Sequence, residues 1–175
     1  MVVNRAVMNM RGISGYFNFR QASPFDVTQL SVNLTNLREL VGPYHVHNFP
    51  VPSVRSGQCS NDNVGGHWNP FAVDTTSPPY PAGPGSTHDK YEIGDLSGKH
   101  MSLSGRSTFQ MTFTDFNLPL FGQNSIVGRS VVIHLVGGDR SFVLKSGNSI
   151  LACADILPES QFAEQTFPNV SAFSR

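Results

Sequence analysis

Charged side chains are scarce in this 175-residue sequence, and neither sign of charge is in excess. Only 14% of the residues are charged, against about 25% in a typical globular domain. Twelve basic residues balance twelve acidic ones. Binding to nucleic acid or to an anionic membrane generally needs a basic surplus, so we expect neither partner. No apolar run approaches the roughly 18 residues of a transmembrane helix, which also argues against a membrane partner.

Cysteine is almost absent, with Cys59 and Cys153 as the two examples. They lie too far apart for a local zinc motif such as CxxC. Two interpretations stay open at this point, namely two buried free thiols or one disulfide. The segment Met1–Met10 lacks the basic region, apolar stretch and cleavage site of a signal peptide. A mature protein, or a domain of a longer chain, would begin in the same way.

Helical periodicity is nearly absent, and apolar and polar residues alternate instead. Within residues 27–34, Thr28, Leu30, Val32 and Leu34 share one face of an extended chain. Further segments of strand length are 2–10, 14–20, 44–49, 94–103, 108–114, 130–136 and 149–157. About eight short strands separated by Gly, Pro and Asn predict an all-β fold, either an antiparallel sandwich or a barrel.

One long segment, Pro50–Ile93, breaks this pattern. It is rich in Pro, Gly, Ser, Asn and Asp and shows no sustained periodicity. Loops longer than about 12–15 residues without secondary structure are usually functional or disordered. Because this one contains Cys59 and His67, we expect it to be functional. The domain is predicted to span residues 1–158, with a tail or linker between repeats at 159–175.

Four of the six histidines stand in settings that suit metal ligands. His45 and His47 are two residues apart, so on a strand their side chains point to the same side. His134 ends an apolar run, where a buried polar ring needs a partner. His67 follows two glycines that permit a tight turn. An all-imidazole site suits copper, zinc, nickel or iron. The residues alone therefore predict a transition-metal site on a β-fold.

Five motifs resemble those of the copper/zinc superoxide dismutase family and occur in the family order. They carry the four histidines and Cys153, and Cys59 precedes the second motif as it does in the family. The motifs are GPYHVH at 42–47, GGHWNP at 65–70, GDLSG at 94–98, SIVGRSVVIH at 125–134, and GN with LAC at 147–153. Each motif is moderately specific, and five in order are very specific. Together they cover most of residues 12–156.

The resemblance implies an eight-stranded antiparallel Greek-key β-barrel, which is an immunoglobulin-like sandwich, with a long disulfide-anchored loop. It implies that this disulfide joins Cys59 to Cys153, and a structural disulfide indicates an oxidising, extracellular setting. It also implies one copper ion bound by His45, His47, His67 and His134.

The zinc ligands of the family are incomplete in this chain. Thr75 and Glu92 stand where two further histidines would be expected, and only the aspartate, Asp95, is kept. His88 lies nearby, but its spacing does not match. This pattern resembles the copper-only superoxide dismutases, so we expect copper as the cofactor and no zinc.

The segment between His134 and Cys153 has only 18 residues, which resembles the shortened loop of the copper-only group. The segments GHWNPF and DKYEIGDLSGK are most similar in sequence to the animal copper-only dismutase-repeat proteins. Those are extracellular chains of several such domains, so the resemblance implies other repeats of the same chain as partners. The family's arginine beside copper is replaced by Ile150. Arg140 is a candidate substitute, and Arg129 matches a structural motif.

The predicted function is copper-dependent dismutation of superoxide to dioxygen and hydrogen peroxide. The resemblance implies that His67 is released from copper and protonated during the cycle. Glu92 occupies a lost zinc-ligand position, so its carboxylate is predicted to orient His67 and favour its protonated form. Asp95 is predicted to fix its loop by hydrogen bonding.

Two rival functions are kept. A copper-binding module for storage, delivery or scaffolding is favoured by Ile150 and by the neutral charge balance. A zinc-containing dismutase would use His88, Glu92 and Asp95 as ligands. Outside that rival, His88 and His100 are expected to be structural or surface residues.

Overall fold

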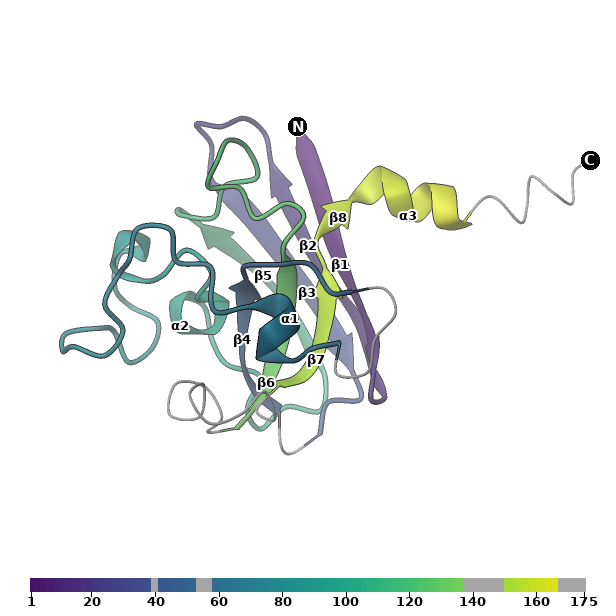
Figure 1. Ribbon diagram of the computed structural model, residues 1–175, viewed down its shortest axis with the longest axis horizontal. Helices are drawn as coiled ribbons and strands as arrows, with labels where there is room; N and C mark the ends of the chain where they lie inside the picture. Colours follow the sequence, from purple (N-terminus) through teal and green to yellow (C-terminus); the bar gives the residue numbers. More distant parts are fainter. Residues whose placement is uncertain (39–40, 53–57, 137–149, 167–175) are drawn as a thin grey trace, which may run out of the picture.

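The chain folds into two antiparallel β-sheets that pack face to face (Figure 1). The computed structural model describes residues 1–38, 41–52, 58–136 and 150–166. The larger sheet has the strand order β5-β3-β2-β1-β8, and the smaller has the order β4-β6-β7. The predicted all-β, antiparallel class is confirmed. Within the described ranges, the strands form two sheets that backbone pairing does not close into one barrel.

The regular elements are short and are mostly strands. The strands are β1 (Val2–Met10), β2 (Ile13–Gln21), β3 (Thr28–Thr35), β4 (Val41–His47), β5 (Phe109–Asp115), β6 (Ser130–Leu135), β7 (Ile150–Asp155) and β8 (Leu157–Pro158). The helices are α1 (Asn61–Val64), the 3₁₀ helix η1 (His88–Lys90), α2 (Leu96–Lys99) and α3 (Glu159–Thr166). None of these helices is long and apolar enough to cross a membrane.

Side-chain alternation determines which face of each strand enters the core. On β3, Thr28, Leu30, Val32 and Leu34 are buried and the residues between them are not, as the alternation predicts. The core lies between the two sheets, where the ring of Tyr44 on β4 lies 5.5 Å from that of Phe17 on β2. Because Tyr44 and Val46 belong to this core, the neighbouring histidines of β4 face the opposite side.

The outer face of the smaller sheet is covered by the long loop. Val64 of α1 packs against Val132 of β6 and Ile150 of β7, and Figure 1 shows α1 lying over this sheet. The Cys59–Cys153 disulfide is present, with 5.7 Å between the Cα atoms. The predicted disulfide is thus confirmed, and it attaches the loop beside α1 to β7. The smaller sheet is therefore enclosed on both faces.

The strand predicted at Gly94–Leu103 is wrong. Asp95 caps α2 instead, since its Oδ1 accepts a hydrogen bond from the backbone N–H of Gly98 at 2.9 Å. Aspartate is among the preferred N-cap residues. The ammonium of Lys99 is buried between Asp115 and the backbone carbonyl of Ile93. Lys99 is thus part of a buried ion pair at the end of a helix.

The predicted tail begins with α3, which extends away from β8 (Figure 1). Arg5 of β1 forms an ion pair with Glu159 at the start of this helix, at 3.4 Å. Residues 167–175 of the predicted tail lie outside the described ranges. The boundary at residue 158 stays a prediction.

Candidate metal centre

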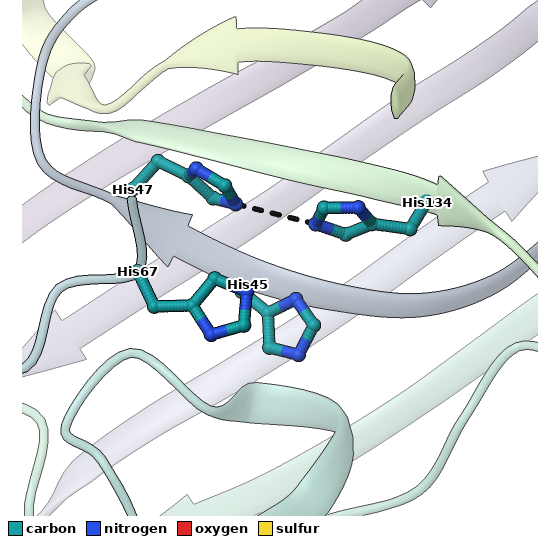
Figure 2. Close-up of side chains that lie close together, drawn as sticks. All are labelled: His45, His47, His67 and His134. Atoms are coloured by element: carbon teal, nitrogen blue, oxygen red, sulfur yellow. Dashed lines mark hydrogen bonds between the residues drawn. The ribbon is translucent and has the colours of Figure 1, made fainter. Parts of the chain in front are cut away.

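Four histidines from three parts of the chain meet on the outer face of the smaller sheet. Each offers one ring nitrogen, and these nitrogens all lie within 4.8 Å of one another. Figure 2 shows that their rings converge. The ligand set consists of His45 and His47 on β4, His134 on β6 and His67 in the long loop. The motif-bearing histidines of the sequence are therefore the ones that the fold brings together.

Local backbone geometry delivers the two histidines that lie away from β4. The pairing of β6 with β7 is irregular between Ile133 and His134, so the register shifts at the ligand. His67 forms an isolated β-bridge with His47. Two backbone hydrogen bonds hold this bridge, from Trp68 N–H to the Val46 carbonyl at 2.7 Å and from Asn48 N–H to the Gly66 carbonyl at 3.0 Å. The loop histidine is thereby attached to the strand of its partners.

Gly65 is required at the turn before His67. Its φ of 73° lies in the left-handed region that favours glycine. A Cβ atom there would lie 2.8 Å from the ring of Phe49. The Gly65 carbonyl oxygen also accepts a hydrogen bond from Nδ1 of His47 at 2.7 Å. The GG pair therefore both positions His67 and orients His47.

Hydrogen bonds assign the tautomers of two ligands. A carbonyl oxygen can only accept, so Nδ1 of His47 carries the proton and Nε2 presents a lone pair. His67 follows the same logic, because its Nδ1 lies 2.9 Å from a carboxylate oxygen of Glu92. The Nε2 atoms of His47 and His134 face each other at 3.2 Å (Figure 2). The Nε2 atoms of His47 and His67 are thus left with lone pairs.

Burial keeps two of these rings neutral. Loss of solvent lowers the pKa of His134 to about 3, with the nearby ring of His67 as a further cause. Burial, followed by the charges of His67 and His134, holds the pKa of His47 well below its usual range. Neutral imidazoles are the form that binds metal. Four imidazole nitrogens in a closely spaced set suit copper or another transition metal of similar preference.

Two carboxylates and a phenol stand behind the cluster. The second nitrogen of His67 is held by Glu92 at 2.9 Å, and Nε2 of His45 lies 3.5 Å from Oδ1 of Asp95. The hydroxyl of Tyr80 contacts both carboxylate-bearing residues. Tyr80 was missed by sequence reasoning, because an isolated aromatic residue in a loop without periodicity carries no signal of its place in space.

Several other residues singled out in the sequence lie outside the cluster. Nδ1 of His88 accepts a hydrogen bond from the backbone N–H of Phe116, and His100 donates to Asp115 at 2.8 Å. Ile150 is buried in the apolar contact under the loop. Arg140 falls outside the described residues.

Arg129 braces the segment that carries His67. Its guanidinium stacks on the ring of Trp68, 3.3 Å from the centroid, and donates a hydrogen bond to the carbonyl of Asn48 at 2.9 Å. The indole N–H of Trp68 donates to the carbonyl of Asn124 at 3.0 Å. These contacts connect both ends of the His47–His67 bridge to the segment before β6.

The family model for copper/zinc superoxide dismutase matches residues 13–156. This chain belongs to the copper/zinc superoxide dismutase family. The family binds copper, and the relatives that are similar to this chain in sequence are superoxide dismutases.

Two curated relatives and one solved structure illustrate the similarity. The chain is 31% identical over 140 residues to Cu-Zn superoxide dismutase 5 of Dictyostelium discoideum, covering 79% of this chain and 78% of the relative. It is 35% identical over 132 residues to cell surface Cu-only superoxide dismutase 5 of Candida albicans, covering 73% of this chain and 52% of the relative. The chain thus spans about half the length of that second relative. A solved mutant structure of Candida albicans superoxide dismutase 5 matches with a TM-score of 0.69 at 25% identity, covering 90% of each chain.

Proposed function

We propose that this chain is a copper-dependent superoxide dismutase domain that works without zinc. His45, His47, His67 and His134 would hold the copper ion. The observation that carries the proposal is the pair of contacts at His67, whose Nε2 belongs to the histidine cluster while its Nδ1 bonds to Glu92. A carboxylate thus occupies the position behind the ring from which a second metal would otherwise act.

Copper bound here would supply one-electron redox chemistry, oxidising one superoxide to dioxygen and reducing another, with two protons, to hydrogen peroxide. The protein residues control the protons and access. The side chain of His67 is 10% exposed, whereas the other three ligands are at most 2% exposed as residues. As the most exposed of the four ligands, His67 is the one best placed to exchange a proton. Glu92 keeps hold of Nδ1 and stabilises the ring when it is charged.

The contacts of the other candidate zinc ligands, Asp95 and His88, support a zinc-free site. Both oxygens of Asp95 accept hydrogen bonds, from Gly98 and from Tyr80. His88 lies with Asp115 instead, at 3.6 Å. His88, Glu92 and Asp95 do not form a group of metal ligands within the described ranges. This arrangement favours copper alone over the zinc-containing rival.

The proposal also includes an extracellular location and the predicted barrel topology. A structural Cys59–Cys153 disulfide is typical of an oxidising compartment, and one similar protein is named a cell surface enzyme. The likeness to the solved Candida albicans structure supports the Greek-key order of the eight strands. Neighbouring dismutase-like repeats as partners and the limits 1–158 stay predictions.

One observation favours a second candidate, a copper-binding module with little or no turnover. Ile150 stands where the family has its arginine, and it is buried against Val132 and Val64. An apolar side chain in that place offers no positive charge to attract superoxide. Copper could then be stored or delivered by the same four histidines without rapid dismutation.

Metal analysis followed by pulse radiolysis tests the proposal. The chain is purified, loaded with equimolar Cu(II) and Zn(II), and measured for bound metal. We expect one copper and no stoichiometric zinc, and rapid superoxide decay. His134→Gln should lose copper, whereas His88→Gln is the matched control and should keep it. Stoichiometric zinc would support the zinc rival, and bound copper without superoxide decay would support the copper-binding module.

A further inference from the structure

A single hydroxyl group connects the two carboxylate residues behind the histidine cluster. The hydroxyl of Tyr80 donates a hydrogen bond to Oδ2 of Asp95 at 2.5 Å. The hydroxyl oxygen of Tyr80 in turn accepts a hydrogen bond from the backbone N–H of Glu92 at 3.2 Å. Glu92 bonds to His67 at 2.9 Å, and Asp95 lies 3.5 Å from His45. Tyr80 is therefore one contact removed from two of the four ligands.

We propose that Tyr80 is a positioning residue that fixes Glu92 and Asp95 behind the cluster, and through them sets the orientation of His67 and His45. This inference rests on the proposed function, because its consequence is measured on bound copper.

The carboxylate of Asp95 is held by donors on both of its oxygens. Gly98 N–H donates to Oδ1 at 2.9 Å, and Tyr80 donates to Oδ2. Asp95 is 1% exposed, so water has little access to replace a lost donor. A buried carboxylate with both oxygens bonded has one preferred rotation. Without Tyr80, Oδ2 loses the hydrogen bond from the hydroxyl, and the carboxylate is less restrained in its orientation relative to Nε2 of His45.

Tyr80 is itself fixed in the long loop. Its backbone N–H donates to the carbonyl of Ser77 at 3.0 Å, and its ring packs edge-on against Tyr91, with 6.0 Å between centroids. Burial, together with the charge of Asp95, raises the pKa of Tyr80 above its usual value of 10. The hydroxyl therefore stays protonated and remains a donor throughout the physiological range.

The adjacent tyrosine provides a matched control. Tyr91 is buried in the same loop, and its hydroxyl donates to the carbonyl of Gly83 at 2.6 Å and accepts from the N–H of Ser86 at 3.3 Å. Tyr80→Phe and Tyr91→Phe each remove one hydroxyl that both donates and accepts a hydrogen bond. Only Tyr80→Phe removes contacts to the residues that face the ligands.

The test compares the full chain with Tyr80→Phe and Tyr91→Phe after loading with Cu(II). Copper affinity is measured by competition with a chelator, and ligand geometry by the hyperfine splitting in the EPR spectrum. We expect Tyr80→Phe to bind copper about 10-fold more weakly, at the low end of the loss typical for outer-shell partners, and to change the EPR spectrum. Tyr91→Phe should match the parent in both. Equal behaviour of the two variants would overturn the proposal.

A second variant keeps the test decisive if Tyr80→Phe does not fold. Asp95→Asn keeps the acceptor for Gly98 and replaces the oxygen that accepts from Tyr80. If Tyr80 acts through Asp95, the EPR change should appear in Asp95→Asn, and an unchanged spectrum there would overturn the proposal even where Tyr80→Phe does not fold. Where Tyr80→Phe folds, the double variant should lose less affinity than the two single losses combined. Additive losses would contradict the proposed connection. A parent chain that binds no copper would overturn the proposed function as well, whereas a normal parent with an unchanged Tyr80→Phe would overturn this inference alone.

Discussion

Nδ1 of His67 lies 2.9 Å from Oε1 of Glu92, and Glu92 is 5% exposed. The carboxylate therefore contacts the imidazole of His67 and is hardly accessible to solvent. A buried acceptor fixes the ring plane and its tautomer, and it can stay bonded whether or not the other nitrogen carries a proton. Glu92 thus holds the ring from behind while the other nitrogen is left for copper.

Glu92 variants should separate the charge of this carboxylate from its shape. Glu92→Gln keeps the shape, and Glu92→Ala removes both, so we expect a larger loss from Ala, within the 10–100-fold range typical of outer-shell partners. Reoxidation of Cu(I) should slow more than reduction of Cu(II), especially at high pH, because it needs a proton and a returning His67. Pulse radiolysis of both half-reactions across pH measures this difference.

Asp89→Asn is the control for that comparison. Asp89 lies on η1 in the same loop, so the variant removes an acidic charge without a contact to His67. It should match the parent in copper affinity and in both half-reactions. If both Glu92 variants behaved like Asp89→Asn, Glu92 would be an ordinary loop residue.

The disulfide should stabilise the fold chiefly by restricting the unfolded chain. Cys59 and Cys153 are 94 positions apart, and closing a loop of that size contributes about 4–5 kcal/mol in the chain-entropy model. We expect the double variant Cys59→Ser with Cys153→Ser to lose up to that amount in denaturant unfolding. Reductant should lower the unfolding free energy of the parent by a similar amount and leave the variant unchanged. A parent that titrates two free thiols when unfolded without reductant would contradict the disulfide.

The sequence predicts the structure correctly where residues of one kind recur at every second position of a strand. The alternation at Thr28–Thr35 identifies the buried face, and the two-residue spacing of His45 and His47 places both rings on one side. The fold class and the histidine set follow from such local rules together with the motif order. Predictions at this level depend on residues that are neighbours in the chain.

The errors arose where long-range contacts decide the structure. The segment Gly94–Leu103, predicted as a strand, contains α2 instead, and its buried Lys99 pairs with Asp115 on β5, 16 positions along the chain. An aspartate three residues before a glycine at 95–98 was an available signal for a helix cap. Tyr80 had no comparable signal, because its position depends on how an irregular loop folds back on α2.

The stability of the metal-free protein should decrease as the pH is lowered from neutral to acid. Burial lowers the pKa of His134 to about 3 in the folded chain, against an unfolded value near 6.5. Between these values the unfolded chain holds the extra proton. The contribution of neutral His134 to the free energy of unfolding is therefore complete above pH 6.5 and is lost as the pH falls toward 3. His134 alone should account for a loss on the order of 3–5 kcal/mol.

Urea unfolding of the metal-free chain at several values between pH 4 and 7 measures this slope. His134→Gln should flatten it, because glutamine does not titrate. His47 contributes in the same direction, since its pKa is also lowered by burial, so some slope should survive in the variant. A parent whose unfolding free energy is constant over this range would show that these rings are not buried as neutral groups.

The buried pair of Lys99 and Asp115 should be a major determinant of stability outside the metal site. Burial alone would raise the pKa of Asp115, but the Lys99 ammonium, followed by the hydrogen bond from His100, holds that pKa well below its usual range. Lys99 donates to Asp115 and also to the carbonyl of Ile93. Neither charge reaches solvent, since Lys99 is 3% exposed and Asp115 is fully buried.

Asp115→Asn should therefore destabilise the protein by about 3–5 kcal/mol, because it leaves an ammonium group buried without its counter-charge. Adding Lys99→Met should recover part of that loss, since replacing both charges removes the uncompensated cation. Urea unfolding at pH 7 gives both free energies. The copper EPR spectrum serves as the control and should stay unchanged, because this pair lies outside the group of four histidines. A double variant less stable than Asp115→Asn would mean that Lys99 is stabilised by its backbone carbonyls more than by Asp115.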